Sequence, residues 1–142
     1  MIAIASDHGG FELKEEVIKK LKAAGYEIND MGTYSEESVD YPNYGKICGE
    51  EVANGKAERG IVICGSGIGV SIAANKVKGI RCALCTSEIM AELAAKHNKA
   101  NLLALGGRLT EKDLAFKIVD KWLNTDFEGG RHERRVNLLN NM

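Results

Sequence analysis

The stretch Ile61-Val62-Ile63-Cys64-Gly65-Ser66-Gly67-Ile68-Gly69-Val70 decides the fold, because it joins an apolar run to a glycine-rich turn. Three consecutive β-branched residues are typical of a strand buried on both faces of a parallel sheet. Cys64 ends this strand, and the small residues after it let backbone N–H groups approach an anion. Because residues 71–76 are expected to be helical, an anion and a thiolate here would both lie at a helix N-terminus.

Two other interpretations of this stretch have to be weighed. A dinucleotide-binding turn has the spacing GxGxxG after the first strand, whereas this turn follows a central strand and its third glycine comes one position early. The glycines can also form a plain strand-to-helix turn, with Cys64 as a small buried apolar residue. On this stretch alone, the plain structural turn remains as good an interpretation as a functional site.

Composition restricts the class of protein. The chain has 142 residues and a formal net charge of −1, so we expect one domain over residues 1–142. Positive residues are dispersed until the C-terminal segment, which disfavours nucleic acid and membrane surfaces as partners and favours a small molecule. Without an export signal or an apolar run long enough to span a bilayer, we expect a soluble, cytoplasmic protein.

The four cysteines are too few for a disulfide scaffold, and we expect them to be reduced. Cys82 and Cys85 form a single CxxC pair, but Cys82 falls in a predicted strand and no second ligand pair exists, so core packing is the better interpretation. Cys48 falls within a predicted helix and is expected to be structural.

Hydrophobic periodicity divides the chain into alternating strands and helices. An amphipathic helix over 11–24 is stopped by Gly25, Pro42 suits the first turn of a second helix, and Ser87 and Thr110 are expected to be N-caps. The expected strands are 2–5, 26–30, 61–63, 80–84 and 102–105, and the expected helices are 11–24, 42–53, 71–76, 88–97, 111–122 and 128–140.

This alternation predicts an α/β fold, a Rossmann-like three-layer sandwich with a five-stranded parallel sheet in a single domain. Ligands of such sheets bind outside the carboxyl ends of the strands. Asp7 and His8 follow the first strand, Cys64 to Gly69 follow the third, and Arg108 follows the fifth. These residues therefore converge on one rim, which favours a functional site at the glycine turn.

Each polar candidate also has a structural alternative. Asp7 and His8 can bind hydroxyls, move protons or hold an anion, but Asp7 can also cap the first helix. His97 can be a general acid or base, or a hydrogen-bonded histidine at the core edge. Arg131 and Arg135, four residues apart on one helical face, suit a phosphate, although such clusters are more often solvated.

Aldose–ketose isomerisation of a sugar phosphate needs the kinds of group predicted here: a thiolate, amide donors, a histidine and guanidinium groups. A base moves a proton between adjacent carbons, and donors stabilise the enediolate oxyanion. A second acid or base opens the sugar ring, and cations hold the phosphate.

The chain resembles the family of ribose-5-phosphate isomerase B and the galactose-6-phosphate isomerase subunits over almost its whole length. The resemblance rests on ordered motifs: Ser6-Asp7-His8-Gly9-Gly10, Asp40-Tyr41-Pro42, Cys64-Gly65-Ser66-Gly67-Ile68-Gly69, Ala73-Ala74-Asn75-Lys76, His97-Asn98, Gly106-Gly107-Arg108 and Glu128-Gly129-Gly130-Arg131-His132. It implies interconversion of ribose 5-phosphate and ribulose 5-phosphate, with no cofactor and no metal.

The resemblance also implies a role for each matching residue. Cys64 would be the proton-transfer base and His97 would assist ring opening, with Ser66 beside the anion hole. Members that lack this cysteine use a glutamate where this chain has Val70, and valine cannot take a proton. The implied sugar contacts are Asp7, Tyr41 and Asn98. The implied phosphate contacts are His8, Arg108, Arg131 and Arg135. The oxyanion would be bound by the backbone amides of Gly65, Ser66, Gly67, Ile68, Gly69 and Val70.

Family members are homodimers with shared active sites, so the resemblance implies that the segment 128–140 reaches the partner subunit, with further assembly left open. Relatives also isomerise six-carbon sugars or their phosphates, and a non-catalytic phosphosugar or nucleotide sensor is a competing hypothesis from another class. A sensor would need neither the Cys64 thiolate nor the acid at His97.

Overall fold

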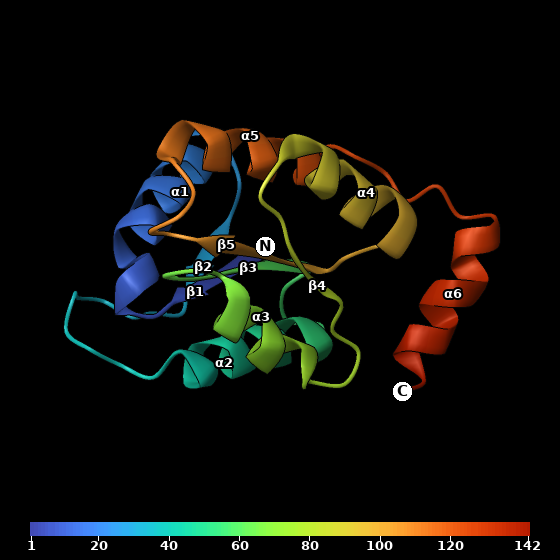
Figure 1. Cartoon of the computed structure of the whole chain (residues 1–142), viewed down its shortest axis with the longest axis horizontal. Helices are drawn as coiled ribbons and strands as arrows, with labels where there is room; N and C mark the ends of the chain where they lie inside the picture. The colour runs from blue at the N-terminus through green and yellow to red at the C-terminus, as the bar shows by residue number, and fades with distance from the viewer.

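The computed structural model describes all 142 residues and confirms the predicted class, a five-stranded parallel sheet between two layers of helices (Figure 1). The strands are β1 (Ile2–Ser6), β2 (Ile28–Asp30), β3 (Arg59–Cys64), β4 (Cys82–Leu84) and β5 (Leu102–Gly106), in the order β2-β1-β3-β5-β4. A short 3-10 helix, η1 (His8–Gly10), precedes the helices α1 (Phe11–Ala23), α2 (Tyr41–Ala53), α3 (Ile68–Asn75), α4 (Glu88–Asn98), α5 (Lys112–Leu123) and α6 (Arg131–Asn140).

Side chains of the central strands alternate between two separate cores. Ile61 and Ile63 of β3 belong to the larger core, which lies under α1, α4 and α5, whereas Val62 and Cys64 belong to the smaller core under α2 and α3. This follows from the two-residue period of a strand. Cys64 therefore faces the layer that contains α3, the helix of the glycine turn.

Small residues let α2 pack closely on α3. A Cβ atom at Gly45 would lie only 2.8 Å from the carbonyl oxygen of Val70, and one at Gly69 would lie 2.4 Å from the ring of Tyr41. A side chain at Gly45 would push the two helices apart, and one at Gly69 would displace the ring of Tyr41. The glycines thus place Tyr41, the first residue of α2, directly against the glycine turn.

Several expected boundaries are wrong. The helix expected over 71–76 begins at Ile68, because Gly67 adopts a left-handed conformation (φ 79°) that ends the turn early. Thr110 is not the N-cap of α5, since Glu111 takes that position and Thr110 is buried with its N–H bonded to Gly106. Strands β2 and β4 are shorter than expected, and α6 begins at Arg131.

Other residues that the sequence predicted to begin or end helices are confirmed. The Ser87 side chain accepts a hydrogen bond from the Met90 N–H at 3.3 Å, as an N-cap does, and Pro42 lies in the first turn of α2. Gly25 follows the end of α1 with a positive φ of 93°, the conformation that favours glycine after a helix.

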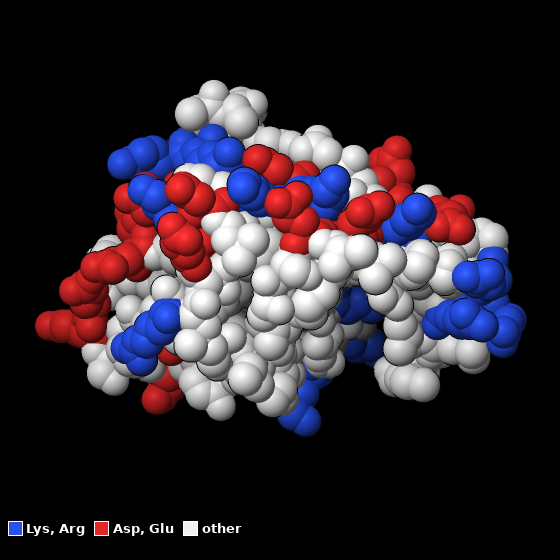
Figure 2. Space-filling view, turned by 45° about the horizontal axis from the view of Figure 1, so that its top comes forward, with Lys and Arg blue, Asp and Glu red and all other residues white.

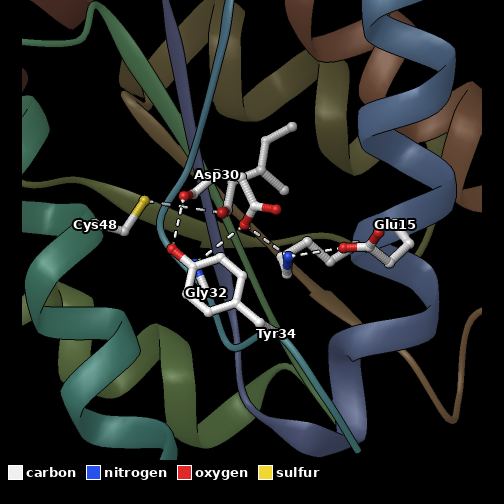
Figure 3. A network of polar contacts seen from close by, with 7 residues as sticks. Glu15, Asp30, Gly32, Tyr34 and Cys48 are labelled. Atoms are coloured by element: carbon white, nitrogen blue, oxygen red, sulfur yellow. Dashed lines mark hydrogen bonds and ion pairs between the residues drawn. The ribbon is translucent and has the colours of Figure 1, made fainter.

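A buried ion pair fastens α1 to the end of β2 (Figure 3). The Lys14 ammonium, with no exposed side-chain surface, lies 2.7 Å from Asp30 and 3.1 Å from Glu15. Asp30 also accepts the N–H of Gly32, and its carbonyl oxygen accepts the hydroxyl of Tyr34. This network fixes the start of the long loop that leads from β2 to α2.

Helix α6 lies at one end of the molecule beside α4, away from both layers that cover the sheet (Figure 1). Only His132 and Val136 of this helix are buried. Most of its surface is therefore unpartnered within the chain. No helix of the structure combines the length and the apolar character needed to cross a membrane.

Candidate active site

An open hollow of about 660 Å³ lies at the carboxyl rim of the sheet, beside the end of β3. Four segments line the hollow: the turn after β1, the start of α2, the glycine turn and the turn after β5. Its lining consists of Asp7, Tyr41, Cys64, Gly65, Ser66, Ile68, Gly69, Ile72, Arg108 and Leu109. The predicted convergence of these segments on one rim is therefore confirmed.

Cys64 is one of the lining residues, and only 5% of it is exposed. Its sulfur accepts a hydrogen bond from the Gly67 N–H at 3.2 Å. The N–H groups of Gly65, Ser66, Gly69 and Val70 donate to no acceptor within the chain. Free amides at a helix N-terminus next to a thiol provide donors for an anion.

The turn after β1 serves both structure and site. Asp7 Oδ1 accepts the Gly10 N–H at 3.1 Å, so Asp7 does cap a helix, the short η1. Asp7 also lines the hollow. The Val39 N–H donates to His8 Nδ1 at 3.2 Å, which leaves Nε2 as the donor of the neutral imidazole.

Glycines bring the turns after β1 and β5 against the glycine turn. The Arg108 N–H donates to the Gly65 carbonyl at 2.9 Å, and the Gly107 N–H donates to the Cys64 carbonyl at 2.8 Å. A Cβ atom at Gly9 would lie 3.0 Å from the Gly65 nitrogen and 3.4 Å from the Arg108 guanidinium carbon. The approach places a cation beside the free amides, as the sequence predicted.

Seven of the predicted site residues do not line this hollow. Three of them are next to lining residues in the chain: His8 in η1, Gly67 at the N-cap of α3, and Val70, which is buried in α3. The other four lie farther away. His97 and Asn98 are the last residues of α4, and Arg131 and Arg135 are on α6; none of them lines it. A crossover helix runs back along the sheet, so α4 ends near the start of β5, whereas Cys64 pairs with Gly106 at the end of β5. The length of β5 alone separates the two positions by roughly 13 Å.

His132, for which the sequence predicted no role, lies beside His97. The two imidazole rings stack with centroids 4.2 Å apart and an angle of 13° between their planes. Burial lowers the pKa of His132 below its ordinary value, and His97 and Arg131 lower it further. The only sequence signal for this pairing is that His132 ends the motif Glu128-Gly129-Gly130-Arg131-His132.

The other three thiols lie in less reactive surroundings. Burial raises the pKa of Cys48 from 9.0 to about 12 and that of Cys85 to about 11, and it also raises the pKa of Cys82. Cys82 is in β4, as predicted, and all four cysteines are free. The expectation that Cys48 is structural agrees with its complete burial.

Three large apolar side chains that line the hollow are exposed. Ile68 and Ile72 of α3 are more than half exposed, and Leu109 beside them is 74% exposed. Figure 2 shows a broad area without charged side chains below a band of mixed charge, and Lys and Arg gather at the end where α6 lies. An exposed apolar group beside a polar site is typical of an interaction surface.

Comparisons with known proteins agree with this geometry. The profile of the family described as Ribose/Galactose Isomerase matches residues 2–139. This chain belongs to that family. Ribose-5-phosphate isomerase B of Escherichia coli is 46% identical over 97% of this chain and 93% of its own length.

Solved structures of the Ribose/Galactose Isomerase family share the fold. Ribose-5-phosphate isomerase B of Clostridium thermocellum is 54% identical, with a TM-score of 0.97 over 99% of this chain and 95% of the other. The Mycoplasma genitalium enzyme, solved with bound ribulose-5-phosphate, is 42% identical, with a TM-score of 0.94 over 99% and 93%. The predicted family, fold and enzyme class, a sugar-phosphate isomerase, are thus confirmed.

Proposed function

We propose that this protein interconverts ribose 5-phosphate and ribulose 5-phosphate through an enediolate, with Cys64 as the proton-transfer base. The observation that carries the proposal is the Cys64 sulfur at the edge of a hollow beside four unpartnered amides. The names of the relatives support the substrate, since the E. coli and C. thermocellum proteins are ribose-5-phosphate isomerases.

The reaction would begin with the open-chain aldose in this hollow. The Cys64 thiolate takes the proton from C2, the C–H electron pair forms the C1=C2 double bond, and the carbonyl oxygen becomes the oxyanion. The amides of the glycine turn stabilise that charge, with the hydroxyl of Ser66 beside them. The Cys64 thiol then returns the proton to C1, where the C1=C2 electron pair forms the new C–H bond. The 2-hydroxyl proton passes to the 1-oxyanion, so the 2-oxygen becomes the ketose carbonyl and the 1-oxygen becomes a hydroxyl.

Substrate contacts are divided between the hollow and the α4–α6 end of the chain. Asp7 and Tyr41 would contact the sugar, while His8 Nε2 and Arg108 would hold the phosphate from this side. The other edge of the sheet carries four more residues. We assign ring opening to His97, a sugar contact to Asn98, and phosphate contacts to Arg131 and Arg135. We propose that a second copy supplies these four residues in a homodimer with shared sites.

Two features support the homodimer. The crossover geometry keeps His97 and Cys64 of one chain at opposite edges of the sheet, so one chain cannot complete the site. The exposed apolar residues of α3 and Leu109 border the hollow, where a second copy would cover them.

Turnover in D₂O tests the reaction. Ribose 5-phosphate should give ribulose 5-phosphate with deuterium at the carbon that receives the proton. Cys64→Ala should abolish turnover while ribose 5-phosphate still binds, and Cys82→Ala, which removes a thiol away from the hollow, should keep full activity. Bound ribose 5-phosphate without turnover in the wild type would favour a six-carbon sugar phosphate or a sensor. Full activity in Cys64→Ala would refute the proposed base.

Mixing two inactive variants tests the shared site. Cys64→Ala and His97→Ala chains are each expected to be inactive. In a mixed dimer one site contains both substitutions and the other contains neither, so random exchange should restore about a quarter of wild-type activity. No recovery, with exchange confirmed by native mass spectrometry, would show that the two residues do not meet across subunits.

A further inference from the structure

His97, Glu128 and His132 form a cluster outside the hollow, between the end of α4 and the start of α6. Each offers one nitrogen or oxygen ligand atom, and these atoms all lie within 4.8 Å of one another. His97 Nε2 and Glu128 Oε2 are 3.7 Å apart, too far for a hydrogen bond. The contact can form an ion pair when His97 is protonated, but no hydrogen bond joins the two imidazoles and the carboxylate.

The buried member of this cluster has an unsatisfied nitrogen. His132 is 6% exposed, and its Nε2 has no hydrogen-bond partner. Buried polar atoms are nearly always satisfied, so an unsatisfied one calls for a missing partner. The neighbouring imidazole of His97 stacks face to face with His132 and does not supply that partner.

We propose that His97, Glu128 and His132 bind a divalent transition-metal cation of the Zn²⁺ class, and that the bound cation inhibits the isomerase. Two imidazoles and one carboxylate with an open fourth position form a ligand set that suits Zn²⁺. Imidazole ligands also favour Zn²⁺ over Mg²⁺ or Ca²⁺, which prefer oxygen. The cation would be an inhibitor, not a cofactor.

Backbone hydrogen bonds hold the segments that carry Glu128 and His132. The Glu128 N–H donates to the Lys96 carbonyl at 2.9 Å, which ties the loop before α6 to the end of α4. The His132 N–H donates to the Gly129 carbonyl at 3.1 Å. Zinc–nitrogen bonds are about 2.0–2.1 Å, so the ligand atoms must move closer, and one of the stacked rings must turn toward the ion.

Positive side chains work against the cation. Arg131 and Arg135 of α6 lie on the same helix as His132, and Lys96 and Lys99 flank His97 in the chain. All four are partly or fully exposed, so solvent and salt screen much of their repulsion. The short-range bonds to two imidazoles are therefore expected to outweigh the repulsion.

The inhibition rests on the proposed function, whereas the binding does not. If His97 opens the sugar ring, a cation that occupies its nitrogen removes the lone pair or proton that the step requires. Binding and inhibition should then share the same ligands.

Calorimetric titration of the full chain with Zn²⁺, after treatment with and removal of a chelator, tests the binding. One Zn²⁺ should bind per chain. Glu128→Gln and His132→Gln should each weaken the binding at least about tenfold, since even the loss of groups that only orient metal ligands has effects of that size. Glu133→Gln is the matched control, because this exposed acid of the same helix is not in the cluster, and it should bind Zn²⁺ like the wild type.

Isomerase assays test the inhibition. Zn²⁺ should inhibit the wild type, a chelator should reverse the effect, and Glu128→Gln should require at least about tenfold more Zn²⁺ for half inhibition. Binding unchanged in both Glu128→Gln and His132→Gln would overturn the proposal, as would binding that only Cys64→Ala removes. If no form of the protein turns over ribose 5-phosphate, the proposed function fails, and the calorimetric comparison still decides the metal site.

Discussion

Breaking the buried ion pair between α1 and β2 should destabilise the fold by an amount that depends on which partner is removed. The Lys14 side chain is 0% exposed, whereas the Asp30 side chain is 31% exposed and keeps the Gly32 N–H as a donor. Leaving one charge of a buried pair unpartnered costs about 3–5 kcal/mol. Lys14→Met leaves the better solvated partner, so its cost should be lower, roughly 2–3 kcal/mol.

Asp30→Ala leaves the ammonium, which is the fully buried partner, with Glu15 at 3.1 Å as its one anionic neighbour. Its cost should therefore exceed that of Lys14→Met. Replacing both residues, as in Lys14→Met combined with Asp30→Leu, removes both charges and should recover stability to within about 1 kcal/mol of the wild type. The expected order of stability is thus wild type and double variant, then Lys14→Met, then Asp30→Ala.

Urea unfolding followed by circular dichroism measures these differences, with thermal melting as a second readout. For a chain of this size, roughly 2–3 kcal/mol corresponds to a Tm lower by about 6–9 °C. A Lys14→Met variant as stable as the wild type would refute the reasoning. So would a double variant that is less stable than both single variants, because the loss would then come from packing and not from an unpaired charge.

Three further predictions concern the thiols and the glycine turn. The pKa of Cys48 is raised from 9.0 to about 12 in the folded state, so its contribution to stability is complete below pH 9 and is lost as the pH rises toward 12. Relative to Cys48→Ala, urea unfolding should show the wild type losing on the order of 1 kcal/mol between about pH 7.5 and 10. Iodoacetamide followed by peptide mass mapping should label Cys64, at the open hollow, before the three thiols whose pKa burial raises, and first labelling elsewhere would contradict the proposed base. Gly106→Ala places a Cβ atom 2.6 Å from the carbonyl oxygen of Ser66, so kcat/KM should fall at least about tenfold in steady-state assays, and unchanged activity would show that the turn tolerates displacement.

Local sequence patterns predicted the elements well where a single chemical signal was strong. The β-branched run before Cys64, the serine at position 87 and Gly25 each gave the correct local structure. The start of α3 was missed because Ile68 and Gly69 continue a glycine-rich composition. The positive φ of Gly67 shows where the helix begins. Only glycine fits there, because a Cβ atom would lie 2.6 Å from the Leu84 side chain and 2.8 Å from the Leu105 backbone, and both of these residues are distant in sequence.

Local sequence patterns could not predict two contacts between residues that are far apart in the chain. Lys14 occupies a polar position of an amphipathic helix, and its complete burial depends on Asp30, which comes from a separate strand. The stacking of His132 on His97 likewise depends on how the loop before α6 folds back onto α4. Spacing along the chain carries no information on either contact.

Topology explains why the residues predicted from motifs form two groups in one chain. Residues that follow a strand must lie at the carboxyl edge, and residues that end a crossover helix must lie at the amino edge. Cys64 and Arg108 are of the first kind, and His97 is of the second. No loop rearrangement within the chain can exchange the edges without unpairing β3 from β5. A reaction that needs both Cys64 and His97 therefore requires two copies of this fold, which is why the mixed-dimer experiment is the most direct test of the proposed mechanism.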